Sequence, residues 1–258
     1  MESQAIESIA NESNKIWKEK TVKKKSNTQN KKHYLSAKTL KQISEWVKKY
    51  KKYISIAKSK QMNESDTSMI VADILSEITW FDKLTDITSE YKIKGQFCDY
   101  GIKYESKLHM LIEIKQISFE LNEWHLYQVT SYAWNEWVKW VILTNLQNRQ
   151  LYAIFLWEKI EKELLLSIDV LSDAKWNDDK IVSFFEMIHK ESIKKKLLEK
   201  LLTEKTAWSK TNIVKIIMKP ETIKYITKQL EKSTKVKIPV EHVYDFLRSS
   251  LDTWWCQK

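Results

Sequence analysis

The chain has 258 residues, of which 43% are hydrophobic and 30% are charged, a balance that is typical of globular proteins and excludes a disordered or fibrous chain. Lysine and arginine exceed aspartate and glutamate by 44 to 34, so the net charge is +10, which suits a polyanionic partner such as nucleic acid. Because only Arg149 and Arg248 are arginine, A/T-rich coding explains the lysine excess equally well.

Cysteine content and hydropathy bear on the compartment. Cys98 and Cys256 are too few for a disulfide framework or a four-thiolate zinc site, which favours a reducing environment. No apolar run approaches the roughly 18 residues that cross a membrane, and the N-terminus lacks a signal-peptide core. We therefore expect a soluble cytoplasmic protein with no membrane partner, in which any metal is held by oxygen.

The N-terminal part of the chain divides into two segments. Residues 1–35 are basic and expected to be flexible, because 18–32 hold seven lysines and almost no apolar side chain. Over 36–62 we expect an amphipathic helix. Its apolar positions step by three and four along the chain: Leu40, Ile43, Val47, Tyr50 and Ile54.

Residues 63–165 have the pattern of an α/β core. A helix is predicted over 63–78, with Asn63 or Ser65 as its cap. Its buried side is expected to be Met69, Ile70, Ile74 and Leu75. Strands follow over 87–94, 98–104 and 109–117, the last two as a hairpin, then a helix over 122–136 and strands over 138–144 and 150–156. This order predicts a mixed β-sheet with helices packed on it.

Residues 166–258 are expected to form a helical C-terminal region. The helical patterns cover 181–202, 221–230 and 240–251, and Pro220 and Pro239 stand near helix starts, where proline is tolerated. Neither glycine in the chain is followed by lysine and then serine or threonine, so a phosphate-binding loop and an ATP-driven motor are excluded.

Glycine and tryptophan contents are unusual together. The chain has 2 glycines and 12 tryptophans, whereas ordinary usage of about 7% would give roughly 18 glycines. Several tryptophans stand where turns favour glycine. One hypothesis is that the gene uses UGA for glycine and that the sequence renders UGA as tryptophan; the alternative is a tryptophan-rich protein. UGG codons at Trp80, Trp137, Trp157 and Trp208 would refute the glycine hypothesis.

One set of residues could carry chemistry. Glu113 and Lys115 lie two apart in a predicted strand and so project from one face, and Asp99 opens the preceding strand of the hairpin. Two carboxylates on neighbouring strands make a hard-oxygen site suited to Mg²⁺, and an amine beside them can orient water and stabilise negative charge on phosphate. A lone Glu-x-Lys is far more often a solvent-facing cross-strand pair than a site. The ordered set of residues is what favours the site.

The helix over 122–136 adds two polar side chains. Gln128 and Tyr132 lie four apart on one helix face, where Gln128 could bond the lysine or a phosphate and Tyr132 could do likewise. The alternative is helix-to-sheet packing for Tyr132 and a solvated Gln128. The five histidines have no metal-ligand spacing.

The arrangement resembles the PD-(D/E)xK nuclease superfamily, and within it the N-terminal nuclease domain of type I restriction enzyme R subunits and their stand-alone relatives. The likeness covers about residues 63–165. The segments that carry it are NESDTSMIVADIL, WFDKLTDITSEYKIKG, CDYGI, LIEIK, HLYQVTSYA, NEWVKWVILTN and QLYAIF. The family has glycine near Trp80 and at Trp137, and usually glycine where this chain has Leu146 and often an aromatic at Arg149.

The resemblance implies a role for each site residue. It makes Asp99 and Glu113 metal ligands, Lys115 the catalytic lysine, and Gln128 with Tyr132 the accessory pair. Glu64 matches an acidic residue placed near the metal. Glu90 lies in a matching segment without a defined role.

The expected function is a Mg²⁺-dependent DNA endonuclease, with Mn²⁺ a possible substitute, that hydrolyses phosphodiesters in restriction or defence, alone or with separate restriction subunits. One rival is a non-catalytic nucleic-acid-binding module with a nuclease-like fold; another is an interaction protein that assembles through the 36–62 helix. Recognition sequence, strand preference and oligomeric state are not specified by the sequence.

Overall fold

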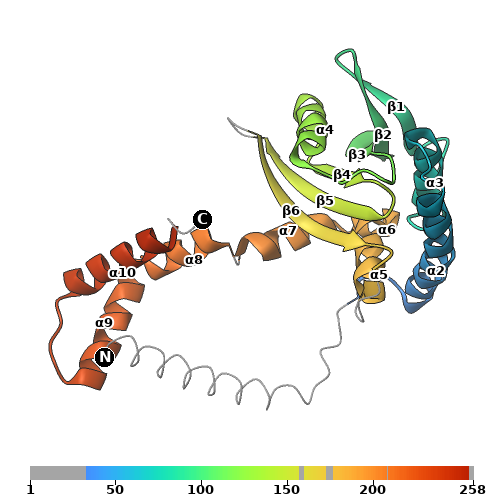
Figure 1. The fold of residues 1–258 in the computed structure, drawn as a ribbon. Coiled ribbons are helices and arrows are strands. Elements are labelled where there is room, and N and C mark those ends of the chain that lie inside the picture. The colour runs from blue at the N-terminus through green and yellow to red at the C-terminus, as the bar shows by residue number, and fades with distance from the viewer. Residues whose placement is uncertain (1–32, 157–159, 173–176, 208, 256–258) are drawn as a thin grey trace. The chain divides into compact units, whose positions relative to one another are not determined.

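The structure is a computed structural model that describes residues 33–156, 160–172, 177–207 and 209–255 (Figure 1). The chain divides into two units, 1–36 and 37–258, and the helices and strands described below belong to the second. The expected flexible segment 1–35 lies almost entirely outside the described residues. None of the described helices is both long and apolar enough to cross a membrane.

A six-stranded mixed sheet forms the centre of the second unit, with its strands in sequence order from edge to edge. The strands are β1 (Ile87–Ile93), β2 (Gln96–Tyr104), β3 (Lys107–Ile114), β4 (Trp140–Thr144), β5 (Asn148–Leu156) and β6 (Ile160–Asp169). Neighbours are antiparallel except β3 and β4, which are parallel. A parallel pair needs a crossover, which helix α4 (Glu123–Asn135) supplies. The predicted mixed α/β sheet flanked by helices is confirmed.

Two tight turns set the register of the first three strands. Lys94 and Gly95 join β1 to β2, and Glu105 and Ser106 join β2 to β3, all four with positive φ. Such two-residue turns match the twist of antiparallel strands. The predicted hairpin of β2 and β3 is therefore confirmed, and the pairing of Tyr100 with Ile112 makes Asp99 and Glu113 neighbours across it.

Helices cover the sheet on both sides (Figure 1). Helix α4 packs on strands β3 to β6, and the buried residues beneath it include the predicted Leu126, Val129, Tyr132 and Ala133. Helix α3 (Glu64–Glu77) packs on β3, α2 (Ala37–Ser59) packs on α3, and α5 (Asn177–Ile188) packs on α2 and β6. The side chain of Asn63 caps α3, as the sequence predicted.

Several predicted details were wrong. Met69 is 69% exposed, because the buried stripe of α3 runs instead through Thr67, Val71, Ile74 and Leu75. Strand β6 was not predicted and crosses the expected boundary at residue 165; its first five residues are exposed, which hides the alternation that marks a strand. Strand β3 ends at Ile114, so Lys115 follows the strand rather than lying in it.

The C-terminal region is helical but more divided than its sequence pattern. The predicted helix over 181–202 is split into α5, α6 (Lys190–Lys194) and α7 (Leu197–Ala207). Helices α8 (Lys210–Ile217), α9 (Pro220–Thr234) and α10 (Val240–Trp255) follow. Pro220 opens α9 and Pro239 directly precedes α10, as expected for proline at helix starts.

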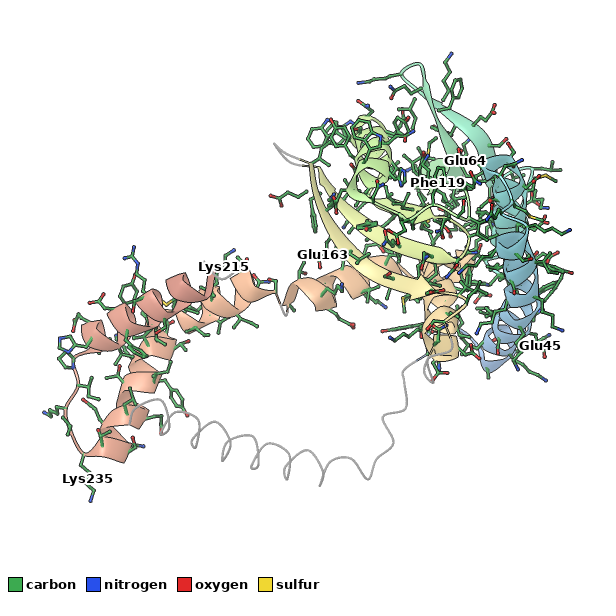
Figure 2. The ribbon with its side chains drawn as sticks, in the orientation of Figure 1. Glu45, Glu64, Phe119, Glu163, Lys215 and Lys235 are labelled. Carbon is green, nitrogen blue, oxygen red and sulfur yellow. The ribbon has the colours of Figure 1, made fainter. Side chains whose placement is uncertain are left out.

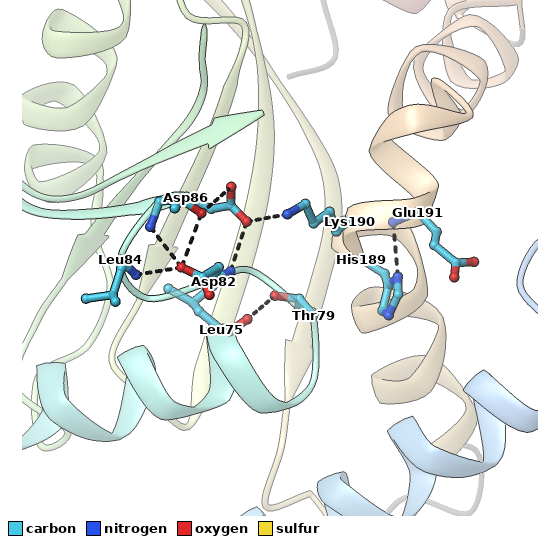
Figure 3. Close-up of polar contacts among 9 residues, drawn as sticks. Leu75, Thr79, Asp82, Leu84, Asp86, His189, Lys190 and Glu191 are labelled. Carbon is cyan, nitrogen blue, oxygen red and sulfur yellow. Dashed lines mark hydrogen bonds and ion pairs between the residues drawn. The ribbon is translucent and has the colours of Figure 1, made fainter. Parts of the chain in front are cut away.

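A polar network ties α6 to the loop that precedes β1 (Figure 3). Asp86 accepts hydrogen bonds through Oδ2 from Lys190 Nζ at 2.5 Å and from the Asp82 N–H at 2.9 Å. The Asp82 carboxylate accepts bonds from the N–H groups of Leu84 and Thr85, each at 2.9 Å. The network therefore fixes the loop from which the first strand begins.

The backbone at two tryptophans favours glycine. Trp80 has φ 63° and Trp137 has φ 56°, a left-handed conformation that bulky residues rarely adopt. Leu146, where the resembling family usually has glycine, has φ 74°. Trp157 and Trp208 lie outside the described residues. The hypothesis that glycine belongs at 80 and 137 thus gains support from geometry that is independent of composition.

Candidate nuclease site

Glu113 and Lys115 form a buried ion pair at the C-terminal end of β3. Lys115 Nζ lies 2.7 Å from Glu113 Oε1, and the two side chains are 13% and 3% exposed. The Lys115 N–H also donates to the Thr144 carbonyl at the end of β4, at 2.8 Å, so the residue after β3 is held by the neighbouring parallel strand. The lysine therefore reaches the carboxylate from the chain segment just beyond the strand.

Asp99 reaches the same place from the adjacent strand β2. Its Oδ2 accepts a hydrogen bond from the Ile114 N–H at 2.6 Å, between Glu113 and Lys115 in the chain. The structure thus brings Asp99, Glu113 and Lys115 together, and β2 supplies one carboxylate where β3 supplies the other.

The charges in this cluster are not balanced. Burial, then repulsion by Asp99, raises the pKa of Glu113 to about 7, although Lys115 opposes the shift. Burial likewise raises the pKa of Asp99, against the bond from Ile114 and the charge of Lys115. Glu113 Oε2 is buried and has no hydrogen-bond partner. One lysine therefore faces one buried and one half-buried carboxylate, and one carboxylate oxygen is left unsatisfied.

A cleft beside Asp99 is lined by further oxygen atoms. Glu64, at the first position of α3, lies in its wall with Ser65 and Ser68, and Glu90 of β1 closes the other side. Glu90 has φ 48°, and the ladder between β1 and β2 is regular on either side of it but not at Glu90 and Asp99. A non-glycine residue in this conformation marks local strain of the kind found at functional sites.

The donor set is chemically suited to a hard divalent cation. In the described part of the chain, no three His, Cys, Asp or Glu side chains are placed to hold a metal together, so Glu64, Asp99 and Glu113 do not converge as a triad. Asp99 is turned to Ile114 and Glu113 to Lys115. Mg²⁺ needs only one or two carboxylates beside water and phosphate oxygens. The free Glu113 Oε2, next to Asp99, fits that requirement.

The accessory pair on α4 is formed, but apart from the cluster. Gln128 Nε2 donates to Tyr132 Oη at 3.1 Å, and Tyr132 is buried in the core beneath α4. Within the described residues no hydrogen bond joins either side chain to Asp99, Glu113 or Lys115. Tyr132 therefore packs between helix and sheet, and Gln128 is half-buried beside it.

Another residue of α4 faces the cluster instead. His125 feels the charges of Lys115 and Glu64, and burial, followed by Lys115, lowers its pKa. Its Nδ1 is buried without a hydrogen-bond partner. His125 stands near the start of a predicted helix, but its proximity to Lys115 and Glu64 could not be predicted from spacing, because those residues follow β3 and open α3, far away in the chain. The same is true of Glu90, whose backbone strain leaves no trace in the sequence.

Comparisons with known proteins add a distant likeness. No protein-family model and no curated protein matches the sequence. Among solved structures, the type IIG restriction endonuclease BpuSI is similar over half of this chain, with a TM-score of 0.35 and 15% sequence identity. The aligned part is 16% of the length of that enzyme.

Proposed function

We propose that the protein is a Mg²⁺-dependent deoxyribonuclease that hydrolyses phosphodiester bonds at the cluster of Asp99, Glu113 and Lys115. One observation carries the proposal: buried Glu113 stands beside half-buried Asp99, both with a raised pKa, and keeps one oxygen unsatisfied, an arrangement that a bound cation would stabilise. The sequence resemblance to the nuclease domain of type I restriction enzyme R subunits implies the same roles for these three residues.

Each side chain has a distinct task in this mechanism. Asp99 and Glu113 would hold Mg²⁺, with Glu64 in the wall of the cleft as a further carboxylate that does not converge on them. When bound, Mg²⁺ supplies positive charge against the phosphodiester and makes water more acidic. Lys115, fixed by its bond to Glu113 and by the Thr144 carbonyl, presents its ammonium group to the phosphate and stabilises negative charge as it develops there. Gln128, half-buried on α4, would support the substrate, whereas Tyr132, buried beneath α4, would hold Gln128 through their hydrogen bond.

The biological setting follows from the resemblance alone. A stand-alone relative of the R-subunit nuclease domain would serve in restriction or defence against foreign DNA, in the cytoplasm, by itself or with separate subunits. The basic net charge of +10 is compatible with a DNA substrate.

The competing function is a nucleic-acid-binding module without catalysis. The absence of a three-ligand cluster among the described side chains is the observation that favours it. Such a module gains nothing from two carboxylates that share one lysine, because the excess negative charge repels phosphate. This cost is why we place the nuclease first.

A plasmid-cleavage assay with Mg²⁺ or Mn²⁺ distinguishes the nuclease from the binding module. Wild type is expected to convert supercoiled DNA to nicked and linear forms, Glu113→Ala is expected to be inactive, and Glu161→Gln, which removes an exposed charge on β6, is expected to match wild type. DNA binding by all three without metal-dependent cleavage would establish the binding module instead.

A further inference from the structure

Three aromatic side chains are exposed in the loop that follows Lys115 and in the first turns of α4. Phe119 is 51% exposed, Trp124 is 72% exposed and Tyr127 is 59% exposed. The rings of Trp124 and Tyr127 lie nearly parallel, 22° apart in plane and 6.1 Å between centroids. Tyr127 follows Trp124 by three positions on α4, so both leave the helix on the face opposite its buried residues.

The backbone beneath these rings is pinned. Asn122 Oδ1 accepts bonds from the N–H groups of Trp124 and His125, each at 3.1 Å, which fixes the first turn of α4. Asn145 Nδ2 donates to the Phe119 carbonyl at 2.7 Å and ties the preceding loop to the end of β4. Rings held on fixed backbone lose little conformational freedom when a ligand binds.

Chain connectivity brings the segments that carry these rings close to the site, and the charges felt by His125 agree with this. The loop that bears Phe119 starts at Lys115, and His125, next to Trp124, feels the charges of Lys115 and Glu64. Phe119 and Glu64 are labelled in Figure 2. A strand whose phosphate met Lys115 would pass its neighbouring bases over these rings.

Exposed aromatic faces beside a phosphate site suit one kind of ligand. Bases stack on aromatic rings without regard to sequence, but in a duplex their faces are already covered by neighbouring base pairs. We infer that Phe119, Trp124 and Tyr127 form a platform for unpaired bases, and that the substrate is single-stranded or locally unpaired nucleic acid. The inference rests on the proposed function for the nature of the ligand and deepens it by naming the substrate class.

Binding by the full-length Glu113→Gln variant tests the platform without cleavage. The probes are a fluorescein-labelled single-stranded oligonucleotide and the blunt duplex of the same sequence, titrated in buffer without divalent metal. We expect tighter binding of the single strand. Adding Tyr127→Ala or Phe119→Ala is expected to weaken that binding at least about five-fold each, as loss of one stacked base does.

Matched variants separate stacking from other causes. Tyr127→Phe keeps the ring and is expected to retain affinity, whereas Tyr127→Leu keeps an apolar side chain without a π face and is expected to lose it. Tyr225→Ala removes a ring that is 64% exposed on α9 and is expected to change nothing. Thermal unfolding checks that each variant folds; because Phe119 and Tyr127 are probed separately, failure of one variant leaves the other decisive.

The contrary results are distinct. Equal or tighter binding of the duplex, full affinity in Tyr127→Leu, or an equal loss in Tyr225→Ala would each overturn the platform. Platform-dependent binding by a wild type that cleaves no DNA with any metal would leave the platform standing and refute the nuclease. DNA cleavage without a preference for unpaired strands would support the nuclease and refute the platform.

Discussion

Two carboxylates of this protein are buried beside a lysine, yet their surroundings differ. Asp86, 8% exposed, is bonded by Lys190, by the Asp82 N–H and by Thr85, and these contacts outweigh burial and lower its pKa. Among the described residues, Glu113, 2% exposed, is bonded only by Lys115, keeps one oxygen unsatisfied beside Asp99, and has its pKa raised to about 7. The first carboxylate is bonded through both oxygens within the fold, whereas the second keeps one oxygen without a partner.

The largest expected difference between the two pairs is catalytic. Lys115→Met should lower DNA cleavage by about 10³-fold, within the range for loss of an essential polar catalytic group. Lys190→Met, which removes the corresponding cation from the structural pair, should leave the cleavage rate per folded molecule unchanged. Initial rates of plasmid nicking, corrected for the folded fraction, measure the effect of each variant. Equal losses in Lys115→Met and Lys190→Met would show that Lys115 has no special role in catalysis.

Next in size is the pH dependence of stability without metal. Because the pKa of Glu113 is about 7 in the folded protein and ordinarily 4.5, the folded state holds a proton that the unfolded chain has released between these values. Stability should therefore fall as pH rises through that window, by roughly 3 kcal/mol from this group. Urea unfolding of wild type and Glu113→Gln at several pH values measures this change in the free energy of unfolding. The same pH dependence in both proteins would show that the pKa of Glu113 is not raised in the folded state.

Asp86 should behave in the opposite sense. Its lowered pKa stabilises the fold above pH 3.8, and this contribution is lost as pH falls through the folded-state pKa. Asp86→Asn should cost about 1–3 kcal/mol at pH 7, since Lys190 loses its anionic partner. Glu113→Gln at the same pH should stabilise the metal-free protein. Paired denaturation curves check the two signs, and destabilisation by both variants would contradict the contrast.

The smallest effect concerns the turns. Trp137 is 76% exposed with positive φ, so Trp137→Gly should raise the free energy of unfolding by about 0.5–1 kcal/mol. Trp124 is equally exposed but lies within α4, and Trp124→Gly should lower it by about 1 kcal/mol. Opposite shifts in thermal midpoint are expected, and a loss of stability in both variants would weaken the case for glycine at 137.

Local patterns were sufficient to predict much of this fold. The hairpin of β2 and β3 was predictable because short β-rich runs flank a turn, and α4 because Leu126, Val129 and Ala133 recur at helical spacing. Those elements are also the ones that bring Asp99 beside Glu113. Strand β6 escaped prediction because its solvent-exposed half carries alternating charges without an apolar face.

The rest of the site depends on contacts between distant segments. Lys115 reaches Glu113 from beyond the strand because Thr144 of β4 holds its backbone, a contact set by the parallel crossover. His125 approaches the cluster through the packing of α4, and Glu90 faces Asp99 through a local irregularity of β1. None of these positions follows from spacing along the chain.

Calorimetric titration of the metal-free protein with Mn²⁺ at neutral pH tests the central claim most directly. The account predicts saturable binding by wild type and by Asp86→Asn under conditions where both are folded, and its loss in Glu113→Gln and Asp99→Asn. Binding by Glu113→Gln as tight as by wild type, or no binding by wild type in the presence or absence of DNA, would contradict it.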